Sequence, residues 1–163
     1  MTAPSTTTSL TAEQKEAAAP FVYGATDEAI AAQLHLSVEG VTSRLKALRA
    51  RLNCKGASRP VVVHALLTAR HVAPPRCNRA VPDFTEEELR LLRAVAEHSV
   101  NTDIGRAIGM PASRVWAHID ALVAKACADN PAHMVGLGHT WGLLDTTVGS
   151  PSAAVAPVTE PSR

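Results

Sequence analysis

The chain is 163 residues long, with 46% hydrophobic and 19% charged residues and a formal net charge of +1. This composition is globular and allows one ordinary domain or two very small ones. The longest apolar run, residues 61–67, is too short to cross a bilayer, and residues 1–9 lack the regions of a signal peptide. Length and composition therefore exclude a membrane or secreted protein, and we expect a soluble, cytoplasmic one with no membrane partner.

The charge is unevenly distributed along the chain. Residues 10–72 contain eight Lys or Arg against five Asp or Glu, whereas residues 84–144 contain five against seven. Five of the basic residues fall between Arg44 and Lys55. Such a run is typical of a phosphate-binding surface, and the alternative is a helix face that is merely solvated.

The two ends of the chain, residues 1–9 and 145–163, are rich in Ser, Thr, Pro and Ala. They can bury little apolar surface, so we expect both tails to be disordered. Between them the apolar pattern is helical throughout, which predicts an all-α fold of two tandem four-helix modules. The first module is expected at residues 10–72 and the second, divergent one at residues 84–144.

An ungapped internal repeat supports this division. A shift of 74 residues aligns Ile30 with Ile104 and Val41 with Val115, and it keeps apolar residues at nearly every position expected to be buried. The linker, residues 73–83, contains three prolines. A semi-extended linker of this length reaches about 34 Å at about 3.1 Å per residue, which is near one turn of DNA.

Each copy begins with the same two helices. Thr11 and Thr85 are N-cap candidates, each followed three residues later by Gln or Glu as in a capping box. We expect these first helices to end near residues 23 and 97. A short second helix follows, capped by Thr26 or Asp27 in the first copy and by Asn101 or Thr102 in the second.

A three-residue turn then leads to the third helix. The turns are residues 35–37 and 109–111, and the third helices are expected at residues 38–52 and 112–126. In the first copy Val41, Leu45, Leu48 and Leu52 form the apolar stripe. The remaining face carries polar and basic side chains, as in the second helix of a helix-turn-helix motif. Fourth helices are expected at residues 58–70 and 132–144.

The pattern resembles the LuxR/GerE-type helix-turn-helix DNA-binding domain of bacterial transcription regulators. In the first copy the resemblance is carried by Leu10, Thr11, Glu13, Gly24, Thr26, Asp27, Ile30, Ala31, Leu34, Leu36, Ser37, Val41, Ser43, Leu45, Leu48 and Leu52. In the second it is carried by Phe84, Thr85, Glu87, Leu91, Leu92, Asp103, Ile104, Ile108, Gly109, Met110, Val115, His118, Ile119 and Leu122.

The resemblance implies a role for two of the helices. In that family the third helix enters the major groove of double-stranded DNA, and the fourth commonly makes the dimer contact. The implied DNA-binding residues are Ser37, Glu39, Thr42, Ser43, Arg44, Lys46, Arg49, Arg51 and Lys55. The implied dimer contact, in a homodimer, is formed by Val61, Val62, Ala65 and Leu66.

The second copy departs further from the family. Trp116, like Thr42 in the first copy, stands where the family has Lys, and the third helix carries little positive charge. Trp116 is equally consistent with a partly buried packing residue and with a residue at an interface. The residues on this face, which would contact DNA, a ligand or another subunit, are Ser113, Arg114, Trp116 and His118.

The leading hypothesis is a sequence-specific DNA-binding transcription regulator without a receiver or sensor domain, in which both modules or only the first bind DNA. The alternative is a non-catalytic protein that binds a small molecule or protein in the crevice between its modules, near Trp116 and Trp141. The histidines and three cysteines show no metal-ligand spacing, and no catalytic constellation is recognisable. We therefore expect no enzyme activity, no metal and no cofactor, with the thiols reduced.

Overall fold

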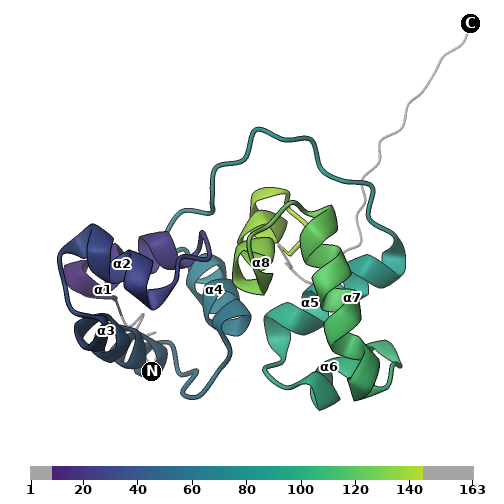
Figure 1. Ribbon diagram of the computed structural model, residues 1–163, viewed down its shortest axis with the longest axis horizontal. Helices are drawn as coiled ribbons and strands as arrows, with labels where there is room; N and C mark the ends of the chain where they lie inside the picture. Colours follow the sequence, from purple (N-terminus) through teal and green to yellow (C-terminus); the bar gives the residue numbers. More distant parts are fainter. Residues whose placement is uncertain (1–8, 145–163) are drawn as a thin grey trace, which may run out of the picture.

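The computed structural model describes residues 9–144, all of which lie in eight α-helices or in the loops between them (Figure 1). The all-α class is therefore confirmed for this part of the chain. The tails expected to be disordered lie outside it, apart from Ser9. The helices are α1 (Ala12–Phe21), α2 (Asp27–Leu34), α3 (Val38–Arg51), α4 (Arg59–Thr68), α5 (Glu86–Glu97), α6 (Asn101–Ile108), α7 (Ala112–Lys125) and α8 (Pro131–Thr140).

We call α1–α4 the first half and α5–α8 the second half. Both begin with the predicted capping box. The backbone N–H of Gln14 donates to Thr11 Oγ1 at 3.2 Å, and the Gln14 side chain accepts from the Thr11 N–H at 3.0 Å. Thr85 and Glu88 repeat the pattern at 3.2 and 2.8 Å. These reciprocal bonds satisfy amide donors that a helix start leaves unpaired.

The 74-residue repeat extends to the turns that follow the second and third helices. His35 and Gly109 both adopt left-handed backbone conformations, with φ of 56° and 72°, and so do Asn53 and Cys127. After that point the register changes, because α8 begins 72 residues after α4. The second half thus lacks two residues of the loop before its fourth helix.

The starts of α6 and α7 differ from the predicted ones, and the end of α1 reflects a proline. Helix α6 is capped by Val100, not by Asn101 or Thr102, and valine has no side-chain acceptor to cap with. Pro111 occupies the N-cap of α7 and not its first turn. Helix α1 has 10 residues against 12 in α5, and it ends one residue after Pro20, as expected for a proline within a helix.

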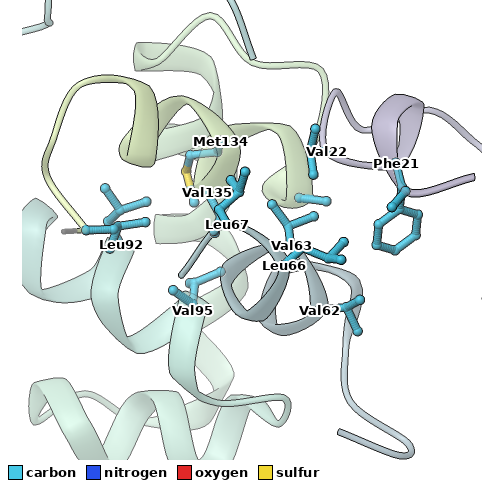
Figure 2. Close-up of a cluster of buried hydrophobic side chains, with 14 of the residues drawn as sticks. Phe21, Val22, Val62, Val63, Leu66, Leu67, Leu92, Val95, Met134 and Val135 are labelled. Carbon is cyan, nitrogen blue, oxygen red and sulfur yellow. The ribbon is translucent and has the colours of Figure 1, made fainter. Parts of the chain in front are cut away.

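The two halves meet through their last helices. Helix α4 packs against α8 and α5, so α4 and α8 lie side by side at the centre of the molecule (Figure 1). Figure 2 shows Val63, Leu66 and Leu67 of α4 among apolar side chains that include Val135 of α8 and Val95 of α5. The buried residues of both halves form one hydrophobic cluster. A single core therefore runs across the boundary between the halves.

This contact involves the residues implied as a dimer surface. Val62 and Leu66 are buried within the single chain, and Val61 and Ala65 are half-buried. An intrachain contact of α4 thus takes the place that was expected for a second subunit, because α8 and α5 already pack against this helix.

The linker is fixed to the body of the protein. Pro75 is fully buried, and its carbonyl accepts a 2.5 Å hydrogen bond from Thr140 Oγ1. A Cβ on Gly136 of α8 would lie 2.6 Å from the Val22 carbonyl oxygen and 2.8 Å from Pro75 Cγ. Only glycine permits α8 to approach this closely. The spacing of the halves is therefore set by packing and not by the reach of the linker.

A histidine pair joins the two central helices. His64 Nδ1 of α4 and His139 Nε2 of α8 are 2.9 Å apart, and their ring centroids are 5.0 Å apart. Burial lowers the pKa of His64, because it disfavours the charged ring, and the nearby Glu97 carboxylate opposes this effect. A hydrogen bond between two imidazoles also requires that at least one nitrogen be unprotonated.

We predict that Leu66→Ala lowers the free energy of unfolding by about 2–5 kcal/mol, because it opens a cavity where the side chain is 0% exposed. Urea unfolding followed by circular dichroism measures this loss. Thr68→Ala, on the exposed end of the same helix, is the control and should change stability by less than about 0.5 kcal/mol. A comparable, sub-kilocalorie loss for both variants would show that α4 is not packed as described.

The His64 environment predicts a pH dependence. The unfolded chain takes up a proton as the pH falls through about 6.5, whereas the folded chain resists it because the pKa of His64 is lowered. The stabilisation is thus complete above pH 6.5 and is lost as the pH falls towards the folded pKa. We expect wild type to lose more stability than His64→Gln between pH 7.5 and 5.5 in urea titrations. Equal losses would contradict this assignment.

Candidate functional site

The candidate site begins with the way α3 is held. Val41, Leu45 and Leu48 are buried and fix one face of α3 against the core. Ser37 caps the helix by accepting a 3.1 Å hydrogen bond from the Gly40 N–H. Anchored at its start and along one side, α3 turns its other face outward.

The outward face holds the residues that the sequence singled out. Arg44 and Arg49 are half-buried. The exposed members of this set are Ser37, Glu39, Thr42, Ser43, Lys46, Arg51 and Lys55.

Not all of these side chains are available to a partner. Arg49 Nε donates to the Ala57 carbonyl at 3.3 Å and so helps to fix the loop before α4. Arg51 donates to the carbonyl of Ser9. Thr42 Oγ1 donates to the Val38 carbonyl at 3.0 Å, as a threonine within a helix commonly does.

Three cations remain uncommitted. Within residues 9–144, the side chains of Arg44, Lys46 and Lys55 form no hydrogen bond or ion pair. Positive charge therefore lies open on α3 and in the loop just beyond it, with Arg44 and Lys46 on opposite flanks of the outward face because they are two positions apart in a helix. We call these three residues the α3 basic face. Because a solvated cation needs no partner, this geometry permits phosphate binding but does not require it.

The corresponding helix of the second half, α7, presents a different surface. Ser113, Arg114, Trp116 and His118 are all exposed, and His118 Nδ1 lies 3.0 Å from the Arg114 carbonyl oxygen. Trp116 is 59% exposed, so it is not a packing residue of the core. The outward face of α7 is therefore aromatic and only weakly basic.

Helix α7 has two basic residues, Arg114 and Lys125, and Lys125 is paired within the second half. Lys125 Nζ lies 2.6 Å from Glu88 Oε2 and 5.6 Å from the centroid of the Phe84 ring. The hydrogen bond from Lys125 is the main cause that lowers the pKa of Glu88. The α3 basic face thus has no counterpart of similar charge on α7.

A crevice of about 630 Å³ lies between the two halves. Val38 at the start of α3 and Trp116 of α7 both line it. Trp141 does not, which corrects the expectation that both tryptophans flank the crevice. Its ring instead packs against Phe84, with centroids 5.9 Å apart.

One wall of the crevice contains an ion pair that the sequence did not reveal. Arg59 at the start of α4 pairs with Asp27 at the start of α2. It also donates to the Ala25 carbonyl at 2.9 Å and lies 5.0 Å from the Phe21 ring centroid. Asp27 and Arg59 are 32 positions apart, so no local spacing pattern could have paired them.

Residues 9–144 contain no group of three or more His, Cys, Asp or Glu side chains placed to hold a metal ion. The cysteines Cys54, Cys77 and Cys127 are free. None of the eight helices has the length and apolar character needed to cross a membrane.

Comparison with known proteins gives no relative from which a function could be transferred. No protein-family model, curated protein or solved structure matches this chain.

Proposed function

We propose that the protein is a DNA-binding transcription regulator whose α3 enters the major groove. The observation that carries this proposal is the α3 basic face. Arg44 and Lys46 on α3, and Lys55 in the loop just after it, have side chains without partners among the described residues, and a buried apolar stripe anchors the helix. A helix is about 10–12 Å wide with its side chains, which matches the major groove width of about 12 Å.

In this proposal, each half is a helix-turn-helix module of the LuxR/GerE type. Helices α2 and α3, and likewise α6 and α7, are in contact and are separated by three residues. The left-handed residues His35 and Gly109 occupy equivalent positions in the two turns. These features support the resemblance found in the sequence, which implies that the third helix is the one that reads DNA.

The two halves would then differ in their roles. We assign DNA contact to the first half alone, because α7 offers an exposed tryptophan where a phosphate contact would need a cation. The second half covers α4, the helix that pairs subunits in the family that the chain resembles. The chain would therefore bind DNA as a monomer, in the cytoplasm, without a homodimer contact through α4.

We expect Arg44→Ala with Lys46→Ala to weaken binding at least about tenfold to duplexes that wild type selects from genomic fragments, because charged contacts to bases and phosphates are lost. Fluorescence anisotropy at several salt concentrations measures the effect. Each lost phosphate contact also reduces the slope of log K against log salt by about one.

The matched control is Arg76→Ala with Arg93→Ala. It removes the same charge from exposed side chains of the linker and of α5. We expect this control to bind like wild type. An equal loss of affinity in the control, or a wild-type protein that enriches no duplex, would overturn the proposed function.

The crevice of about 630 Å³, lined by the exposed Trp116, favours a second candidate function, the binding of a small molecule, which does not depend on DNA binding.

A further inference from the structure

The crevice between the halves has the size and position of a ligand site. Its volume of about 630 Å³ lies within the range of about 300–1,000 Å³ that is usual for small-molecule pockets. Such pockets form preferentially where two units of a protein meet. Both halves contribute to it, since α2, α3 and α4 face α5, α6, α7 and α8 across the opening.

Part of the crevice lining is apolar and aromatic. Trp116 is 59% exposed and Val38 is 38% exposed, which places both among the few large apolar side chains left open to solvent. Ile104 and Ile119 extend the same lining. An uncovered tryptophan on an apolar wall provides a stacking surface for a planar ring.

Another part of the lining is formed by two helix starts. Helices α4 and α6 begin at the crevice, and neither has a side-chain cap bond. Pro60 of α4 has no N–H, and the Asp103 N–H of α6 donates to the Val100 carbonyl at 3.0 Å. The other amides of these first turns carry the partial positive charge of a helix N-terminus.

Ser58 provides independent evidence for a ligand. Its Oγ is buried without a hydrogen-bond partner among the described residues, although Ser58 stands at the N-cap of α4 and lines the crevice. A buried hydroxyl without a partner is costly unless something in the crevice bonds to it. A ligand with an acceptor group would satisfy both this hydroxyl and the amides.

The charge of the lining limits the ligand further. Arg59 is already paired with Asp27, and Glu28 adds a second carboxylate. The lining therefore has one uncompensated negative charge, which opposes a polyanion such as a nucleotide more strongly than a ligand with a single carboxylate. We propose that the crevice binds a small aromatic carboxylate, with its ring on Trp116 and its carboxylate at Ser58 and the N-termini of α4 and α6.

The test uses 2-naphthoate as the probe and the full chain carrying Trp141→Phe, so that Trp116 is the one tryptophan. We expect saturable, one-to-one binding that changes the emission of Trp116, and weaker binding of the ring without its acid group, 2-methylnaphthalene. Calorimetry checks the stoichiometry independently of fluorescence. No binding at millimolar 2-naphthoate, or equal binding of the two compounds, would overturn the proposal.

Variants locate the site. We expect Trp116→Ala, measured by calorimetry, to weaken 2-naphthoate binding at least about tenfold, and Ser58→Ala to weaken it several-fold. Neither side chain is needed for folding, because Trp116 is exposed and Ser58 makes no cap bond. Val81→Ala removes an exposed apolar side chain outside the crevice and should bind like wild type. Unchanged affinity in Trp116→Ala would contradict the assignment.

Discussion

The packing of α4 against α8 and α5 is the contact on which the rest of the structure depends. A chain of about 60 residues buries a smaller fraction of its surface than a larger domain does and is marginally stable alone. With 3% aromatic residues in the chain, each half has an aliphatic core of limited volume. The joint core, to which Leu66 and Val135 contribute from opposite halves, makes that core continuous. Stability therefore comes from the pair of halves together.

The same packing explains how two similar halves can differ in surface. Because α8 packs against α4, the second half stabilises the first. In the proposed function its third helix does not bind DNA and therefore does not require a basic face. Helix α7 instead exposes Trp116 beside the crevice, while Lys125 is held by Glu88. Val38 belongs to both proposed sites. It begins the helix proposed to bind DNA, and it also lines the crevice.

Local features of the fold could be predicted from the sequence because they depend on neighbouring residues. Thr11 with Gln14, and the stripe of Val41, Leu45 and Leu48, follow from helix geometry alone. The α4–α8 contact could not be predicted, since an apolar helix face does not specify which surface covers it. The cap at Val100 could not be predicted, because Asn101 and Thr102 are intrinsically better caps, whereas the helix starts after an exposed valine.

The candidate site was predictable to a similar extent. Exposure of Lys46 follows from its place away from the apolar stripe, whereas Lys55 lies in the loop after α3. The bonds of Arg49 and Arg51 to carbonyls depend on loops that bring distant residues together. The crevice, the histidine pair and the orphaned Ser58 hydroxyl likewise arise only where the two halves meet. The apolar pattern of a sequence describes each helix separately, so it does not predict which side chains meet between the two halves.

Cleavage of the linker tests most directly whether packing alone holds the halves together. A protease recognition sequence inserted between Ala80 and Val81, which are both exposed, allows the chain to be cut after folding. We expect the two fragments to elute together in size-exclusion chromatography, at the position of the intact 17.1 kDa protein. Separation into two smaller folded species would show that the halves are independent and that the α4–α8 contact does not organise the structure.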